Sequence, residues 1–225
     1  MRVLAALVAF CFTAAAPPRN PSGPKPKADL ELPTAPYEKP VASCAPGKKC
    51  IVAYRLNEEI NEQSAKTVID WISAAEDAHA DAFMLEMNTP GGEVDQGFEI
   101  AKKIENSKIP ITCVVDGMSA SMGAYILQSC PTRVVTRRSV IMFHEPSLGG
   151  LFAGRQFDWT AIAERMRVMT NAMAEHCVHR MAISLKEYHA RTDGGKQFWM
   201  DEKDALKFKA VDKVVWSVQE VLASL

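Results

Sequence analysis

From residue 51 onward, short apolar segments alternate with segments whose apolar residues recur at helical spacing, and this alternation restricts the fold more than any other feature. Six segments have the length and composition of strands: residues 51–56, 82–87, 109–115, 133–136, 139–143 and 211–216. Helical spacing is clearest at Ala65, Val68 and Ile72. Parallel strands need long crossover connections, which are usually helices. The sequence therefore predicts one α/β domain with a largely parallel sheet and crossover helices.

The longest helical pattern follows the fifth of these strands. Its apolar face consists of five residues: Ile162, Met166, Met169, Met173 and Cys177. Methionine adapts to irregular surfaces, so the face suits a contact between subunits. Packing against the chain's own sheet is the commoner arrangement for such a face, and both interpretations stay open here.

The first 47 residues differ from the rest. Residues 1–16 begin with Met1-Arg2, continue with an apolar run and end in small residues, which is typical of a secretory signal peptide. Residues 17–47 are rich in proline and predict an extended linker. The folded domain is then expected at 48–225, in a periplasmic or secreted protein. A lipid anchor through Cys11 is an alternative, although Phe10 is bulky where such signals have a small residue.

The cysteines agree with export. Cys44 and Cys50 bracket a turn-forming loop, and we predict a disulfide between them, which an oxidising compartment permits. Two free thiols are the alternative. Cys113, Cys130 and Cys177 lie in apolar or helical contexts and are expected to be buried thiols.

Charge and ligand spacing narrow the function classes. The formal net charge of −1 gives no indication of a nucleic-acid or anionic-membrane partner. No cluster of His, Cys, Asp and Glu has the spacing of metal ligands, so we expect neither a metal nor another cofactor.

Two glycine-rich turns follow predicted strands, at residues 88–92 and 117–124. Sites in parallel sheets form where strands end and helices begin, and backbone N–H groups of such turns can stabilise an oxyanion. Ser121 lies at the expected start of a helix and needs a base to act as a nucleophile. Of the five histidines, only His144 ends a strand and enters a turn at the same edge. Without a catalytic role, Ser121 would be a helix cap and His144 a hydrogen-bonded turn residue.

Three segments resemble, in order and spacing, the successive motifs of the Clp protease proteolytic subunit (ClpP) family. They are MNTPGG at 87–92, GMSASMGA at 117–124 and IMFHEP at 141–146, and the resemblance extends from Ile51 to the last strand. It implies the crotonase-like ClpP fold. It also implies that the long helix is a handle through which two rings interlock, and hence a homo-oligomer.

The resemblance also implies roles for individual residues. Ser121, rather than Ser119, would be the nucleophile, and His144 the general base. The N–H groups of Gly92 and Met122 would form the oxyanion hole. No metal or other cofactor is implied.

The third member of the triad is where the sequence departs from the family. By register with the segment that begins at Phe198, the acid's position falls on Gln197. The nearest acid upstream is Asp193, followed by Gly194-Gly195. Either Asp193 reaches the histidine through the flexible glycines, or the site works without a carboxylate. As a structural residue, Asp193 would lie in a solvated turn.

The expected function is a serine endopeptidase that hydrolyses peptides or unfolded proteins through an acyl-enzyme. If the chain is exported, an ATPase partner is not expected. One alternative is a serine–lysine signal-peptide peptidase with Lys102, Lys103 or Lys196 as base. Others are a crotonase-type acyl-CoA enzyme and a catalytically inactive scaffold on the same fold.

Overall fold

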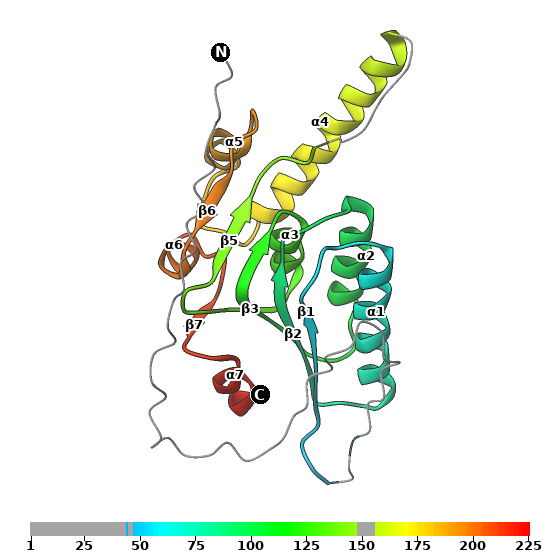
Figure 1. Cartoon of the computed structure of the whole chain (residues 1–225), viewed down its shortest axis with the longest axis vertical. Helices are drawn as coiled ribbons and strands as arrows, with labels where there is room; N and C mark the ends of the chain where they lie inside the picture. Colours follow the sequence, from blue (N-terminus) through cyan, green and yellow to red (C-terminus); the bar gives the residue numbers. More distant parts are fainter. Residues whose placement is uncertain (1–43, 45–46, 148–155) are drawn as a thin grey trace, which may run out of the picture. The chain divides into compact units, whose positions relative to one another are not determined.

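The computed structural model describes residue 44 and residues 47–147 and 156–225 (Figure 1). The predicted signal peptide and nearly all of the predicted linker lie outside these residues. Within the described part, seven strands form one sheet, in the order β1-β2-β3-β4-β7, with β5 against β3 and β6 against β5. All pairs are parallel except β5–β6. The predicted α/β class with a largely parallel sheet is confirmed.

Most of the predicted elements are present. The strands are β1 (Ile51–Leu56), β2 (Ala82–Thr89), β3 (Ile111–Ala120), β4 (Thr132–Thr136), β5 (Val140–Phe143), β6 (Phe198–Met200) and β7 (Lys213–Val215). The helices are α1 (Glu62–Asp77), α2 (Val94–Glu105), α3 (Met122–Ser129), α4 (Gln156–Val178), α5 (Leu185–Thr192), α6 (Glu202–Lys207) and α7 (Val218–Ser224). The apolar pattern did not predict α5, β6 or α7, which have eight, three and seven residues and are too short for a clear periodic pattern.

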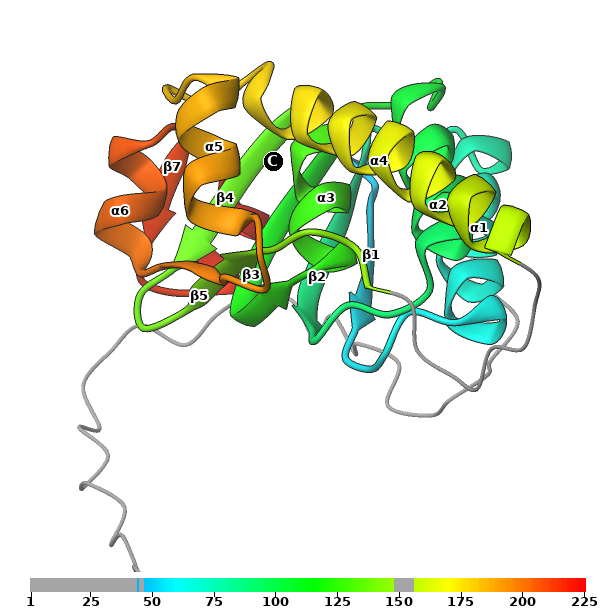
Figure 2. The ribbon, with the colours of Figure 1, turned by 90° about the horizontal axis from the view of Figure 1, so that it is seen from above.

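Alternate residues of each strand point to opposite faces of the sheet, and an apolar core covers each face. Phe83 and Leu85 of β2 belong to the larger core, which includes residues of α1, α2, α3 and α4. Met84 belongs to a smaller core on the other face, which Val218 and Val221 of α7 cover. Figure 2 shows α1 to α4 side by side on one face of the sheet.

Strand β3 is longer than predicted and changes partner along its length. Its first half pairs with β4, and Met118–Ala120 pair with β5. Gly117 lies between the two halves with φ of +114°, a conformation that L side chains rarely adopt. A Cβ there would lie 2.5 Å from Oδ1 of Asn88. The predicted turn at 117–120 is therefore a bend in a continuous strand.

The long helix α4 is confirmed, and its two ends differ. Ala174 and Cys177, near its C-terminal end, are buried in the larger core. Trp159, near the N-terminal end, is 41% exposed, and Val168, in the middle of the helix, is 54% exposed. That end extends beyond the strands (Figure 1). In the described part of the chain, no helix is long and apolar enough to cross a membrane.

The described residues contain two disulfides. The predicted bond between Cys44 and Cys50 is present. A second bond joins Cys113 of β3 to Cys130, which caps α3. The expectation of buried thiols at Cys113 and Cys130 was wrong, because the sheet places their Cα atoms 6.0 Å apart although 17 positions separate them. Cys177 is a free, buried thiol, as predicted.

Candidate active site

Ser121 occupies the single-residue turn between β3 and α3. Its φ of 55° and ψ of −120° are unusual for a residue with a side chain and cost on the order of 1–3 kcal/mol. Two backbone hydrogen bonds hold this conformation. Ser121 N–H donates to Met142 O at 2.8 Å, and Ser121 O accepts from Tyr125 N–H at 3.2 Å. A strained strand–turn–helix junction of this kind exposes a nucleophile at the edge of a sheet.

His144 lies one residue beyond β5 and contacts Ser121. The distance from His144 Nε2 to Ser121 Oγ is 2.7 Å. This contact follows from the sheet, because Ala120 of β3 pairs with Met142 of β5. Ser121 is the next residue after Ala120, and His144 is two residues after Met142. The predicted proximity of Ser121 and His144 is confirmed.

Burial lowers the pKa of His144, and the charge of Glu145 opposes this shift in part. The lowered pKa favours the neutral imidazole at neutral pH. A neutral Nε2 can accept the proton of the serine hydroxyl, which is what a general base requires.

The N–H group of Gly92 is free to point into the site. Ile60 forms an isolated parallel bridge with Gly92, in which Ile60 N–H donates to Gly91 O at 2.7 Å and Glu93 N–H donates to Ile60 O at 2.8 Å. In a parallel bridge of this pattern, Ile60 is hydrogen-bonded to Gly91 and Glu93, the residues before and after Gly92. The N–H of Gly92 itself therefore points away from Ile60. Among the described residues, this N–H has no hydrogen-bond acceptor.

The second predicted oxyanion donor is in the first turn of α3. Met122 is the first helical residue, so its N–H has no acceptor within the helix. Gly91 packs directly against this turn: a Cβ at Gly91 would lie 2.6 Å from Ser121 Cβ and 2.9 Å from Met122 N. The loop that carries Gly92 therefore lies next to the residues that carry the nucleophile and the second donor.

Ser119, the other serine of the motif, cannot meet a substrate in this structure. It is fully buried, and among the described residues its Oγ has no hydrogen-bond partner. Ser121, in contrast, is half-buried and lines a narrow pocket with His144, Tyr125 and Met173. The geometry therefore distinguishes the two serines as the motif did.

The candidate acids lie elsewhere. Asp193 Oδ1 is 2.9 Å from Nδ1 of His189, one turn earlier on α5. Gln197 Oε1 accepts a hydrogen bond from Trp199 Nε1 at 2.9 Å. Within the described part of the chain, neither residue forms a hydrogen bond with His144. The structure thus shows a Ser121–His144 pair, and it does not bring Asp193 or Gln197 to the imidazole.

Two of the three lysines that a serine–lysine enzyme could use are engaged away from the site. Lys103 Nζ forms an ion pair with Glu76 Oε2 at 2.7 Å, and Lys196 Nζ donates to Ala190 O at 2.9 Å. His144 occupies the position beside Ser121 where a lysine would be needed. Among the described residues, no group of three or more His, Cys, Asp and Glu side chains could hold a metal ion.

A wider cavity of about 570 Å³ adjoins the narrow pocket. The start of α2 and the side of α4 form its walls, with Val94 shared between the two cavities. Met166 and Met169 line it on the α4 side, and Glu93 and Asp95 on the α2 side. Sequence reasoning considered these methionines for a subunit contact or for packing against the sheet. It did not identify the cavity, because the walls of the cavity come from segments some 70 residues apart.

Comparison with known proteins gives a consistent result. A family model described as Clp protease matches residues 48–218. The ATP-dependent Clp protease proteolytic subunit 1 of Protochlamydia amoebophila is 34% identical over 141 residues, which are 61% of this chain and 67% of that protein. The proteins with the same description from Chlamydia muridarum and Chlamydia caviae are each 28% identical. They are matched over 86% and 93% of their lengths, by 73% and 77% of this chain.

Proposed function

The chain belongs to the Clp protease family and is a serine peptidase, and we propose that Ser121 is its nucleophile and His144 its general base. The observation that carries this assignment is the 2.7 Å contact between His144 Nε2 and Ser121 Oγ at a strained turn. Ser119 is buried and its Oγ has no hydrogen-bond partner among the described residues, so the neighbouring serine does not compete for the role.

The proposed reaction proceeds through an acyl-enzyme. Ser121 Oγ attacks the scissile carbonyl carbon while His144 Nε2 accepts the hydroxyl proton. The N–H groups of Gly92 and Met122 stabilise the oxyanion, and the N-terminal end of α3 adds a favourable dipole. His144 then donates the proton to the leaving amine, and a water molecule hydrolyses the ester by the same steps in reverse order.

We propose that the reaction uses a serine–histidine dyad in the conformation seen here. Asp193 is hydrogen-bonded to His189, so its carboxylate does not orient His144. Known triads that lose their acid keep part of their activity, because the oxyanion hole and substrate binding remain. A dyad is therefore compatible with a functional peptidase of reduced turnover.

A fluorophosphonate probe, which reacts with activated serines, tests the assignment directly. Wild-type protein and Ser119→Ala should be labelled, whereas Ser121→Ala and His144→Ala should not. Lys103→Ala and Lys196→Ala serve as controls for the serine–lysine alternative and should be labelled normally. Labelling of Ser121→Ala at the wild-type rate would show that the nucleophile is another residue.

We further propose that the protein is exported and acts without an ATPase. The signal-like residues 1–16 support export, and so do the disulfides Cys44–Cys50 and Cys113–Cys130, because such bonds persist mainly in oxidising compartments. The relatives are described as ATP-dependent, and a cytoplasmic ATPase would not reach an exported chain. Cell fractionation tests the location, and peptide hydrolysis with and without ATP tests the second part. An unprocessed chain in the cytoplasm would contradict export.

We also propose a homo-oligomer in which α4 forms contacts between subunits. Trp159 and Val168 expose large apolar side chains on this helix, and Ile162 and Met166 are only half-buried. Large exposed apolar side chains on one projecting element suit an interface. Light scattering of the mature protein at micromolar concentration should give a mass several times that of the chain. A monomer mass would contradict the proposal.

A further inference from the structure

The disulfide between Cys113 and Cys130 encloses the nucleophile in a covalent loop. Cys113 lies in the first half of β3, and Cys130 follows the last residue of α3. The loop therefore contains the rest of β3, the strained turn at Ser121 and the whole of α3. Both cysteines are fully buried. The bond fixes the C-terminal end of α3 to the strand from which its N-terminal end departs.

Helix α3 needs such a restraint because it is short. It has eight residues, and isolated helices shorter than about 12–15 residues are marginal in water. The Ser121 side chain makes no capping hydrogen bond to α3, so the serine does not stabilise the helix start in the usual way. The backbone conformation of Ser121 persists only if the flanking strand and helix are held in place.

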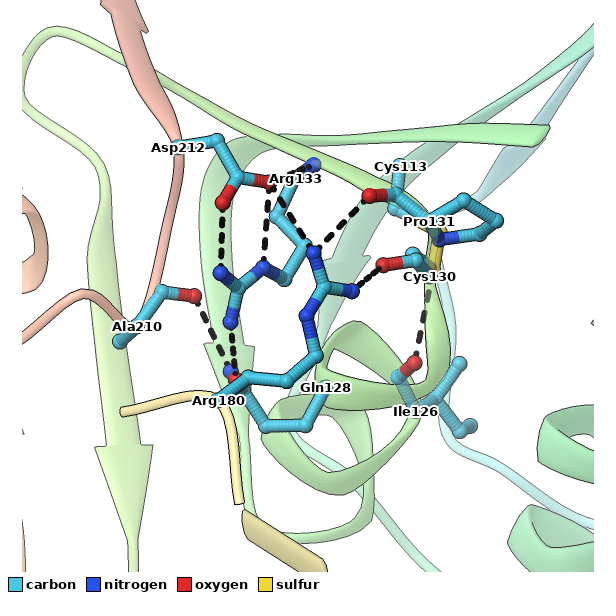
Figure 3. A network of polar contacts seen from close by, with 9 residues as sticks. All are labelled: Cys113, Ile126, Gln128, Cys130, Pro131, Arg133, Arg180, Ala210 and Asp212. Atoms are coloured by element: carbon cyan, nitrogen blue, oxygen red, sulfur yellow. Dashed lines mark hydrogen bonds and ion pairs between the residues drawn. A yellow bond between two sulfur atoms is a disulfide. The ribbon is translucent and has the colours of Figure 1, made fainter. Parts of the chain in front are cut away.

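The far end of α3 is attached to the rest of the domain by a polar network (Figure 3). The guanidinium of Arg180, just after α4, donates to the carbonyl oxygens of Cys130 and Pro131. Arg133 of β4 donates to Gln128 Oε1 at 2.6 Å. The network ties the residues around Cys130 to two other elements, so the disulfide links β3 to an end of α3 that is itself fixed.

Arg133 also connects this end to the segment before β7. It donates to both carboxylate oxygens of Asp212, at 2.6 and 3.2 Å, and Arg133 is almost fully buried. Bidentate pairs of this kind have a defined geometry. Gln128 Nε2 donates to Ala210 O at 3.1 Å. Strand β4 and the segment before β7 thus help to define where α3 ends.

We propose that the Cys113–Cys130 disulfide is a positioning element for Ser121, so that full peptidase activity depends on this bond being oxidised. The proposal rests on the assignment of Ser121 as nucleophile. Without the bond, the polar network still holds the C-terminal end of α3, but no covalent link sets its distance from β3, so α3 can move relative to β3. Such a movement displaces Ser121 Oγ relative to His144 Nε2 and Met122 N–H relative to the oxyanion. A misplacement of about 1 Å can cost about 100-fold in rate.

The double variant Cys113→Ala/Cys130→Ala tests the proposal, and Cys44→Ala/Cys50→Ala is the matched control. The control removes the other disulfide, which lies before β1 and closes a loop without site residues. Labelling of Ser121 by the fluorophosphonate and the separate kcat and KM values for a peptide are measured at a temperature where all proteins are folded by circular dichroism. The labelling rate and kcat of the first variant should fall about tenfold or more, with KM nearly unchanged, and the control should match wild type.

A labelling rate of the folded first variant within threefold of wild type would overturn the proposal, because the bond would then contribute stability alone. If that variant does not fold, the measurement is made on Cys44→Ala/Cys50→Ala, in which Cys113–Cys130 is the remaining disulfide among the described residues. Dithiothreitol reduces this buried bond to two thiols during transient opening of the fold and becomes a cyclic disulfide, and thiol titration and circular dichroism show that the bond is reduced while the protein stays folded. The labelling rate should then fall, and oxidation by glutathione disulfide should restore it. Absence of labelling in the oxidised wild type would instead contradict the proposed function itself.

Discussion

Gly91→Ala is the substitution that most directly tests how the oxyanion loop is placed against the nucleophile. Gly91 has φ of +96°, and an added Cβ would meet Ser121 Cβ at 2.6 Å, Ala120 O at 2.7 Å and Met122 N at 2.9 Å. Ordinary van der Waals contact begins at 3.4 Å. To bring the 2.6 Å contact to 3.4 Å, the loop that carries Gly91 and the turn at Ser121 would have to separate by about 0.8 Å.

The expected effects follow from this separation. A positive φ costs a residue with a side chain about 1–2 kcal/mol, and overpacking adds about 1–3 kcal/mol. Each kcal/mol lowers Tm by about 2–4 °C in a domain of this size. Because the displaced atoms carry the nucleophile and the oxyanion donors, kcat/KM should fall by about 10- to 100-fold. Peptide hydrolysis and thermal unfolding of the purified protein measure both effects.

Gly47→Ala is the matched control. Gly47 also has a positive φ, of +75°, but no atom of the described residues lies within 4 Å of an added Cβ. It should lose about 1–2 kcal/mol of stability and keep wild-type kcat/KM. If Gly91→Ala keeps wild-type kcat/KM, or if Gly47→Ala loses activity to the same extent, the argument that Gly91 sets the spacing of the site is wrong.

Four further predictions concern residues in and around the site. Burial lowers the pKa of His144, and the imidazole must be neutral to act as a base. Activity should therefore be lost as pH falls through a midpoint below 6.5, and a pH profile of kcat/KM with a higher midpoint would contradict this. Replacing Glu145 by Gln removes the charge that opposes the shift, so the same profile should move to still lower pH. Asp193→Asn should change turnover by less than about threefold, because Asp193 contacts His189, whereas a loss of orders of magnitude would show that Asp193 orients His144 during catalysis. Ser119→Ala should keep full activity and an equal or higher Tm, since it removes a buried hydroxyl that has no hydrogen-bond partner in the described part of the chain; a Tm loss of several degrees would contradict this.

The sequence was sufficient to predict the sheet and the meeting of Ser121 with His144, because both depend on periodicity and on the rule that sites form at strand ends. It could not predict the Cys113–Cys130 bond. That bond depends on how closely α3 returns over β3, which neither cysteine's local context shows. Asp193 was a candidate acid because it is the nearest acid upstream of Gln197, the position in register. The sequence did not show that α5, which begins at Leu185, places His189 one turn before Asp193 and in hydrogen-bonding contact with it.

The change of partner along β3 is what turns three separate motifs into one site. If β3 continued straight beyond Val115, its last residues would remain beside β4, and β5 would have no strand to pair with at Ala120. The bend at Gly117 redirects those residues to β5, and the pairing of Ala120 with Met142 then brings His144 to Ser121. Asn88, in the first motif and near the end of β2, accepts through Oδ1 a hydrogen bond from Met118 N–H at 3.0 Å and so holds the bend against β2. The glycines of the motifs therefore act first on the course of the backbone, and the contact between the serine and the histidine is a consequence of that course.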